Sequence, residues 1–252
     1  MKLEGKKAVF VGGASGMARA SAEMMAERGA SVAIMDLPTS AGAEVAKQLG
    51  GPFEPVDVMD EENVEQALGA IVEQLGGLHI AVNTAGGGTA MRTLTKQGPL
   101  SLAVFRRVIE LNLIGTFNLN RLQADYMSRN EPEEDERGVI IDTASIAAFE
   151  GQIGQVAYTA AKAGIAGMTF TMARDLGSLG IRVVTIAPSL FGTGLTQGIP
   201  DEMAANLTRD AAFPKRMGRP EEYGRLAVAI VETPMLNGST IRLDAGQRFA
   251  PK

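Results

Sequence analysis

Three residues whose side chains can act on an alcohol or a carbonyl lie in one short stretch of the second half of the chain. They are Ser145, Tyr158 and Lys162. Alanine content and the absence of proline predict a helix over residues 155–167, so that Tyr158 and Lys162 stand one turn apart on one face. A phenol titrates at about 10 in water, and a neighbouring ammonium lowers that pKa by stabilising the phenolate. The spacing therefore predicts that Tyr158 takes or gives the proton of an alcohol/carbonyl pair.

Ser145 is expected on the loop that follows a strand over Val139–Asp142. A hydroxyl in that place can hydrogen-bond the substrate oxygen as charge develops on it. The Tyr-x-x-x-Lys spacing alone has moderate weight, because about 0.1 such pairs are expected by chance in a chain with three tyrosines. Its interpretation depends on a second signal near the start of the chain.

That second signal is a glycine-rich turn between a strand and a helix. The apolar run Lys7–Val11 predicts the strand, and a helical pattern continues to Arg28. Glycines let backbone amides approach a pyrophosphate, and the helix N-terminus adds partial positive charge. A glycine turn alone is a weak signal, but it makes four residues candidate phosphate contacts: Gly12, Ser15, Gly16 and Met17.

The next predicted strand, Ser31–Met35, ends at Asp36, about 20 residues after the turn. A carboxylate in this position can accept hydrogen bonds from both hydroxyls of an adenosine ribose and repels a 2′-phosphate. Neither Ser15 nor Leu37 supplies a basic side chain to offset that repulsion. The sequence therefore favours NAD(H) over NADP(H).

Strands alternate with helices along the rest of the chain, which predicts parallel pairing with right-handed crossovers. We expect a single α/β domain of the Rossmann type: a doubly wound, seven-stranded, mostly parallel sheet with helices on both faces. Its cofactor half covers about residues 1–140 and its catalytic half about 141–252. The other strands are predicted at Phe53–Val56, Leu78–Val82, Arg182–Ile186 and Ser239–Leu243, and the other helices at Ala41–Leu49, Glu61–Leu75, Ser101–Tyr126 and Glu221–Val231.

Two segments lack a clear period. Residues 128–137 are rich in charge and predict an exposed loop. The stretch Leu190–Pro214 follows a strand end and is rich in small residues, which favours a mobile cover over the site. The alternative for the second segment is a plain surface insertion.

Composition excludes several function classes. A net charge of −5 argues against nucleic acid as a partner, and the lack of cysteine excludes disulfides and thiolate nucleophiles. The only histidine, His79, lies in a predicted core strand, so we expect it to be structural and expect no metal site. No apolar stretch is long enough to cross a membrane and the N-terminus lacks a signal-peptide pattern, so a cytoplasmic protein is expected.

Asn112 lies within the apolar part of the long predicted helix. A buried asparagine needs hydrogen-bond partners. It is therefore either a satisfied structural residue or a site residue, and its spacing does not decide between them.

Taken together, these motifs resemble the short-chain dehydrogenase/reductase family over nearly the full chain. The resemblance implies an enzyme in which Tyr158 exchanges the proton, Ser145 orients the carbinol oxygen, and Lys162 binds the nicotinamide ribose while favouring the tyrosinate. Asn112 would hold a water molecule that links Lys162 to solvent. The motifs are Gly12-x-x-x-Gly16-x-Ala18, Asp57-Val58, Asn83-Thr84-Ala85-Gly86, Asn112, Ser145, Tyr158-x-x-x-Lys162 and Pro188.

The resemblance also implies cofactor contacts: Asp57 and Val58 at the adenine, Asn83, Ala85 and Gly86 along the cofactor, and Ile186, Pro188 and Thr193 near the nicotinamide. Three positions depart from the family pattern. Ala18 replaces a glycine and is expected to tighten helix–strand packing, Thr84 replaces an asparagine, and Ser189 replaces a glycine and narrows backbone freedom.

Within the family, the stretches GVIIDTASIAAFEGQIGQVAY and GIRVVTIAPSLFGT resemble dehydrogenases of 3-hydroxyacyl-CoA. The likeness implies NAD-dependent interconversion of a secondary alcohol and a ketone in lipid metabolism, and a homotetramer. An alternative substrate is a hydroxysteroid or another hydrophobic alcohol, which the apolar loop Leu190–Leu195 would also suit. A remote alternative is a nucleotide-sensing protein without turnover.

Overall fold

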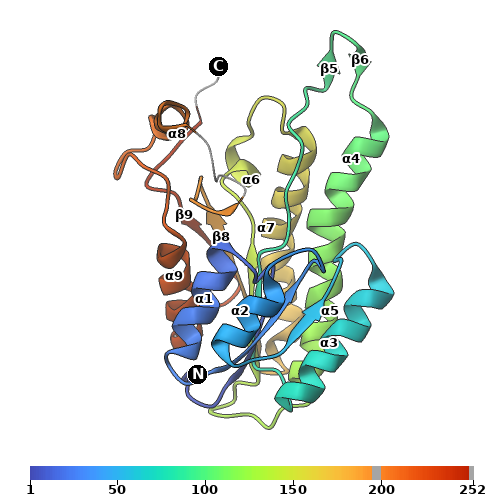
Figure 1. The fold of residues 1–252 in the computed structure, drawn as a ribbon, viewed down its shortest axis with the longest axis vertical. Coiled ribbons are helices and arrows are strands. Elements are labelled where there is room, and N and C mark those ends of the chain that lie inside the picture. The colour runs from blue at the N-terminus through green and yellow to red at the C-terminus, as the bar shows by residue number, and fades with distance from the viewer. Residues whose placement is uncertain (195–199, 250–252) are drawn as a thin grey trace.

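The computed structural model describes residues 1–194 and 200–249 and contains one seven-stranded sheet with helices on both faces (Figure 1). The strand order is β3-β2-β1-β4-β7-β8-β9, and every pairing in it is parallel. The expected fold class is confirmed. The strands are β1 (Lys7–Val11), β2 (Ser31–Asp36), β3 (Phe53–Pro55), β4 (Ile80–Asn83), β7 (Gly138–Thr143), β8 (Ile181–Pro188) and β9 (Thr240–Leu243).

Successive residues of the central strands point to opposite faces of the sheet and pack into two hydrophobic cores. In β1, Ala8 and Phe10 belong to one core, and Val9 and Val11 belong to the other. A strand buried on both faces is apolar throughout, which is why β1 appears in the sequence as an unbroken hydrophobic run. Helices α1 (Gly16–Ala26), α2 (Gly42–Leu49) and α9 (Pro220–Glu232) cover the first core, and α3 (Glu61–Leu75), α5 (Gly115–Ser128) and α7 (Val156–Gly177) cover the second.

The strand order reverses between β1 and β4, because β2 lies on one side of β1 and β4 on the other. In open parallel sheets, the carboxyl ends of the strands at such a switch point form the ligand-binding crevice. The glycine turn after β1 and the loop after β4 both begin at this place.

The long predicted helix is not continuous. Helix α4 (Leu102–Ile109) passes into a π-helical segment, η1 (Glu110–Ile114), before α5 begins. One extra residue is accommodated in this turn, and such π-bulges are frequently found at functional sites. Three elements too short for a clear period were also not predicted: the β5–β6 hairpin (Leu94–Thr95 and Gly98–Pro99), α6 (Ala147–Glu150) and α8 (Asp201–Thr208).

Helix α8 lies within Leu190–Pro214, for which the sequence predicted no regular structure. Residues 195–199, and with them the end of the predicted apolar loop, lie outside the described residues. The expectation of a mobile cover therefore stays a prediction.

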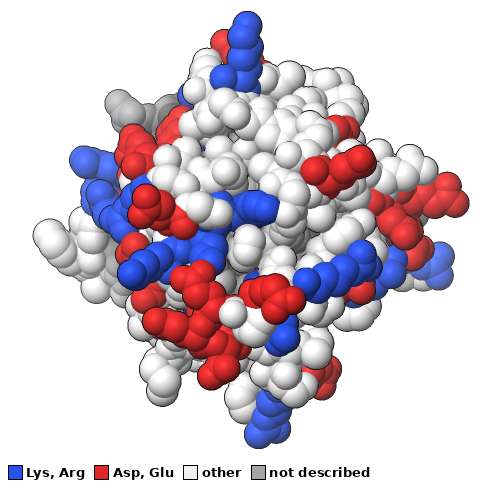
Figure 2. All heavy atoms as spheres, turned by 90° about the horizontal axis from the view of Figure 1, so that it is seen from below, with Lys and Arg blue, Asp and Glu red and all other residues white. Residues whose placement is uncertain are grey.

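The charged segment 128–137 is mostly exposed, as predicted, although Glu136 within it is partly buried. Glu136 is 10% exposed and pairs with Arg182 at 2.7 Å, so this loop is joined to β8. Seen from below, acidic and basic side chains lie interspersed over this end of the molecule (Figure 2).

His79 lies directly before β4. Its Nδ1 accepts a hydrogen bond from the Lys7 amide at 3.3 Å, and its own amide donates to the Lys7 carbonyl at 2.8 Å. Burial, together with Lys6 and Lys7, lowers the pKa of His79 to about 4. His79 thus joins the start of β4 to β1 through hydrogen bonds with Lys7. The described residues form no cluster of three or more His, Asp or Glu that could hold a metal ion.

Among the described helices, none is both long enough and apolar enough to cross a membrane.

Candidate active site

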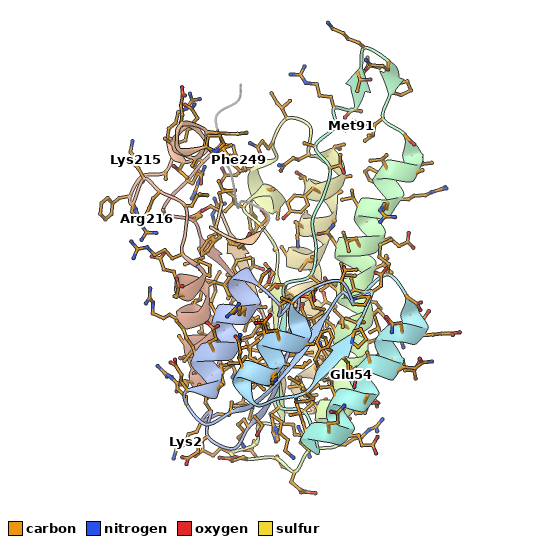
Figure 3. All side chains as sticks on the ribbon, in the orientation of Figure 1. Lys2, Glu54, Met91, Lys215, Arg216 and Phe249 are labelled. Atoms are coloured by element: carbon orange, nitrogen blue, oxygen red, sulfur yellow. The ribbon has the colours of Figure 1, made fainter. Side chains whose placement is uncertain are left out.

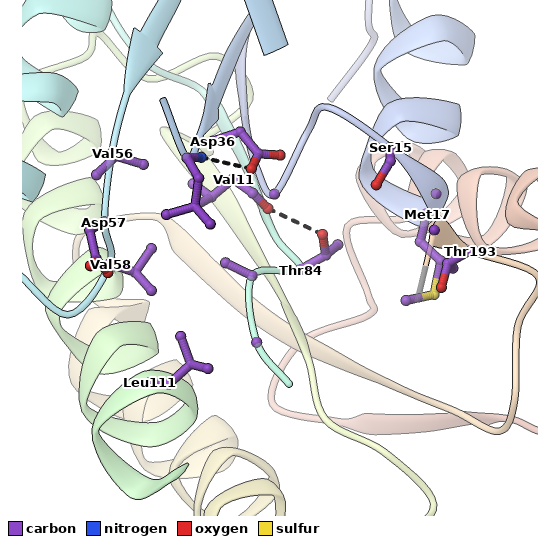
Figure 4. Close-up of a pocket in the computed structure, with 16 residues that line it drawn as sticks. Val11, Ser15, Met17, Asp36, Val56, Asp57, Val58, Thr84, Leu111 and Thr193 are labelled. Carbon is purple, nitrogen blue, oxygen red and sulfur yellow. Dashed lines mark hydrogen bonds between the residues drawn. The ribbon is translucent and has the colours of Figure 1, made fainter. Parts of the chain in front are cut away.

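A cavity of about 320 Å³ opens at the switch point of the sheet (Figure 4). We call it the glycine-turn cavity. It brings together most of the predicted cofactor residues from four strand ends and one distant loop. These are Gly12, Ser15, Gly16, Met17, Asp36, Asp57, Val58, Ala85, Gly86 and Thr193.

The glycines of the turn have no room for side chains. Gly12 has φ +79°, and a Cβ there would lie 2.8 Å from Thr84 Oγ1. Gly16 has φ +57°, and a Cβ there would lie 2.9 Å from Thr193 Cγ2. Both conformations favour glycine, so the backbone at this end of α1 stays uncovered toward the cavity.

Asp36 holds the turn as well as lining the cavity. Its Oδ2 accepts a hydrogen bond from the Ala14 amide at 2.8 Å, and its Oδ1 accepts from the Leu37 amide at 2.7 Å. Each carboxylate oxygen has a further lone pair, so the acid can still accept from a ligand hydroxyl.

These residues fit a dinucleotide cofactor. The Ser15 side chain makes no capping hydrogen bond at the N-terminus of α1, which leaves helix amides there for an anion. An acidic side chain for ribose hydroxyls and apolar residues for adenine line the same cavity, the latter including Val58 and Leu111. The residues of this cavity would hold the nucleotide part of the cofactor.

Asn83 is an exception among the predicted cofactor residues. Its side chain is 3% exposed and donates to Asn120 Oδ1 at 2.9 Å, Gln123 Oε1 at 2.9 Å and Asp142 Oδ1 at 3.0 Å. The strand pleat turns this side chain into a buried polar network, and Asn83 is not among the residues that line the cavity, so its predicted contact with the cofactor stays a prediction. Ile186 and Pro188 are buried in β8 and line neither cavity of the site.

A second cavity, of about 580 Å³, lies beside the first, and we call it the Tyr158 cavity. Consecutive residues divide the two cavities: Gly86 lines the first, and Gly87 and Gly88 line the second. Phe249, which also lines it, lies at the end of the molecule that carries α8 and the β5–β6 hairpin (Figure 3).

Ser145 and Tyr158 both line the Tyr158 cavity. Ser145 follows β7, and its Oγ accepts a hydrogen bond from the Ala147 amide at 3.1 Å, which orients the hydroxyl at the start of α6. Burial raises the pKa of Tyr158, and a hydrogen bond with Ser145 opposes that rise. The sequence predicted a lowered pKa; in these surroundings desolvation is the larger effect.

Lys162 lies one turn after Tyr158 on α7, as predicted, but does not donate to the phenol oxygen. Its Nζ donates to the Thr143 carbonyl at 2.8 Å and lies 5.6 Å from the centre of the Tyr158 ring. The residue is 3% exposed. Burial lowers the pKa of Lys162 to about 8, and the Asp142 carboxylate opposes that shift.

Asn112 belongs to the π-helical segment and is fully buried. Its Nδ2 donates to the Gly87 carbonyl at 2.6 Å and to the Val108 carbonyl at 2.9 Å, and its Oδ1 accepts from the Gly87 amide at 3.1 Å. The two alternatives for this residue are therefore not exclusive. Its amide is satisfied structurally and also fixes the loop that divides the two cavities, while the implied water relay stays a prediction.

Several site residues were not predicted. Thr84, Leu111 and Gly194 line the glycine-turn cavity beside predicted neighbours, and strand-end position is the signal that could have found Thr84. In the Tyr158 cavity no sequence signal indicated its three glutamines or the phenylalanine of the C-terminal segment, which are Gln152, Gln155, Gln247 and Phe249. Leu207, from α8, also lines this cavity.

The arrangement can exchange a proton with a secondary alcohol or a ketone. Tyr158 supplies the acid or base, Ser145 a hydrogen bond to the reacting oxygen, and Lys162 a nearby positive charge. All three lie next to a cavity that fits a nucleotide.

Comparison with known proteins agrees with this geometry. A family model described as enoyl-(acyl carrier protein) reductase matches residues 12–248. The 3-hydroxyacyl-CoA dehydrogenase type-2 of Drosophila melanogaster is 49% identical, with 96% of this chain and 97% of that protein covered. The human protein of the same name is 48% identical, with 99% and 97% covered.

The fold comparison points the same way. The crystal structure of 3-hydroxyacyl-CoA dehydrogenase type-2 from Mycobacterium avium matches with a TM-score of 0.94 and 42% identity, and covers 98% of each chain.

Proposed function

We propose that this chain, which belongs to the short-chain dehydrogenase/reductase family, interconverts 3-hydroxyacyl-CoA and 3-oxoacyl-CoA with NAD(H) as its cofactor. One observation carries the reaction class. Ser145 and Tyr158 both line a cavity that is separated only by the Gly86–Gly88 loop from a cavity fitted to a dinucleotide.

The chemistry follows from the roles of three side chains. Tyr158, as phenolate, accepts the proton of the substrate hydroxyl, and Ser145 donates a hydrogen bond to the same oxygen. Lys162 stabilises the phenolate from across the ring of Tyr158, 5.6 Å from its centre. When bound, a nicotinamide would supply the acceptor for the hydride that leaves the carbinol carbon.

Preference for NAD(H) is supported by Asp36. The carboxylate lines the glycine-turn cavity and already accepts two backbone hydrogen bonds that fix its orientation. A 2′-phosphate placed there would meet a negative charge, and Leu37 beside it offers no compensating cation.

The thioester substrate is supported by the relatives' names and by the residues that line the Tyr158 cavity. These include apolar side chains for an acyl chain, such as Leu190 and Phe249, and amides, such as Gln152 and Gln155. The same apolar lining would accept a hydroxysteroid, but the relatives of nearly half identical sequence favour the thioester.

A homotetramer is part of the proposal. Leu102, Ile114 and Phe117, along the α4–η1–α5 helix, are 59%, 50% and 49% exposed, and apolar side chains of that size in one row suit a subunit interface. Light scattering on the purified protein at several concentrations tests it, and a monomer throughout would reject it.

The test of function is the initial rate of NADH formation with a series of 3-hydroxyacyl-CoA thioesters and with hydroxysteroids, each with NAD and NADP in parallel. We expect NAD-linked turnover of the thioesters to exceed that of the steroids by at least about tenfold in kcat/KM. Equal or greater rates with the steroids would reject the thioester assignment. NADP-linked rates equal to NAD-linked rates would reject the cofactor assignment.

A further inference from the structure

One buried acid of the molecule is not used by the mechanism above. Asp142, in β7, is fully buried, with 0% of its surface exposed. Its Oδ1 accepts from Asn83 Nδ2 at 3.0 Å and its Oδ2 accepts from Asn120 Nδ2 at 2.6 Å. Both neighbours present amide donors, so the site is built for a carboxylate that accepts on both oxygens.

Asp142 and Lys162 lie on the same face of the sheet. Side chains alternate along a strand, so Asp142 shares the face of Ile140, which packs in the core covered by α5 and α7. Asn120 confirms the direction, because its Nδ2 also lies 3.7 Å from the Met172 sulfur of α7. The carbonyl that accepts from Lys162 Nζ belongs to Thr143, the residue next to Asp142.

Tyr158, on the same helix, has its ring centre 5.6 Å from Lys162 Nζ. Among the described residues, Asp142, in β7, is the acid whose charge opposes the lowering of the pKa of Lys162, and its side chain lies on the face of the sheet that α7 covers. From α9, Tyr223 reaches the same strand through a 2.7 Å hydrogen bond to Thr143 Oγ1, and it is a neutral phenol. A lone buried ammonium is costly, and an opposite charge on the same face offsets that cost.

We propose that Asp142 is the counter-anion of Lys162, a positioning residue whose buried negative charge keeps the lysine protonated while Tyr158 exchanges a proton with the substrate. Asp142 touches neither cavity and acts only through Lys162. The proposal rests on the proposed function for its catalytic consequence, but its electrostatic claim concerns the cofactor-free chain.

The main variant is Asp142→Asn, which removes the charge and keeps the shape. A second, double variant combines Asn120→Asp with Asp142→Asn. It exchanges the amide and the carboxylate of this hydrogen-bonded pair, so that the negative charge is kept but moves from position 142 to position 120. The matched control is Asp125→Asn on α5, an exposed acid paired with Arg129.

The first readout needs no cofactor or substrate. Lys162 has a folded-state pKa of about 8, below its ordinary value, so the unfolded chain binds more protons above that pH and stability rises with pH there. In Asp142→Asn the rise should begin at a lower pH, by about one unit or more, because an attractive charge has been lost. Urea unfolding at a series of pH values measures this.

The second readout is the pH profile of kcat/KM. In Asp142→Asn the alkaline limb should move to lower pH by a similar amount, which is a loss of about tenfold at a fixed pH above the new limb. The double variant should fall between Asp142→Asn and wild type, and Asp125→Asn should coincide with wild type. If Asp142→Asn does not fold, the double variant alone should show both displacements.

Unchanged onset of the stability rise in both charge variants would overturn the proposal, and so would a uniform loss of activity with the limb in place. A wild-type chain that turns over no thioester would reject the proposed function instead, and the unfolding series would still decide the role of Asp142.

Discussion

At the scale of single residues, the site depends on how burial and hydrogen bonds balance at Tyr158. Burial raises the pKa of this phenol and the hydrogen bond with Ser145 lowers it, so the serine has an electrostatic role besides orienting the substrate oxygen. In the proposed mechanism a positive charge at Lys162 also favours the phenolate. That mechanism therefore depends on both neighbours to bring the pKa of the phenol toward neutral pH.

Replacing Ser145 by alanine should lower kcat by roughly 10²–10³-fold, because a hydrogen bond to the developing oxyanion is lost. The pKa of Tyr158 should rise further, so the basic form appears only at higher pH and the rising limb of kcat/KM moves upward. A pH series on this variant measures both effects. Ser178→Ala, at the exposed end of α7, is the control, and an unmoved limb in Ser145→Ala would contradict the role given to the serine.

At the scale of elements, the first half of the sheet was predicted almost residue by residue. Strand β1 and helix α3 have the predicted bounds, because an unbroken apolar run and a regular helical period are strong local signals. The π-helical turn around Asn112 was not predicted, because it depends on a contact with a residue distant in the sequence. The Asn112 side chain accepts a hydrogen bond from the Gly87 amide and donates one to the Gly87 carbonyl. The buried position of the Asn83 side chain has the same origin, because its partners Asn120 and Gln123 come from α5.

A further prediction concerns Asp36, which joins the end of β2 to the glycine turn. Asp36→Asn removes the negative charge that accepts a hydrogen bond from the Ala14 amide and lines the cavity. NADH affinity should fall by about tenfold to a hundredfold, since hydrogen bonds to charged groups contribute about 1.5–3 kcal/mol. NADPH affinity should rise relative to NADH as repulsion of the 2′-phosphate is relieved.

Fluorescence titration with both cofactors measures the change, and Asp125→Asn again serves as the remote control. An unchanged ratio of NADH to NADPH affinity would show that Asp36 does not select the cofactor.

At the scale of the whole molecule, stability in acid is linked to the single histidine. His79 has a folded-state pKa of about 4, lowered by burial and by Lys6 and Lys7, against an ordinary value of 6.5. The unfolded chain therefore binds more protons between these values, and His79 makes the protein lose stability as pH falls through that window. Burial raises the pKa of Asp142 to about 6, so protonation of Asp142 stabilises the folded chain as the pH falls. This contribution is the same in wild type and in a His79 variant, so it cancels when the two are compared.

His79→Asn keeps an acceptor for the Lys7 amide and removes the titration. Between about pH 7 and about pH 4.5, this variant should lose less unfolding free energy than wild type. Urea unfolding at the two pH values gives the difference directly. Equal losses in the two proteins would show that His79 is not the acid-sensitive group.

The most direct test of the central claim, that Tyr158 is the proton-transfer group of a nicotinamide-dependent alcohol dehydrogenase, is the rate of NADH formation from a 3-hydroxyacyl-CoA by the Tyr158→Phe variant. Tyr126→Phe, on α5 and outside both cavities, is measured beside it. We predict a loss of about 10²–10⁴-fold in kcat for Tyr158→Phe, with NADH affinity within about twofold of wild type. A Tyr158→Phe variant that turns over at the wild-type rate would contradict the account.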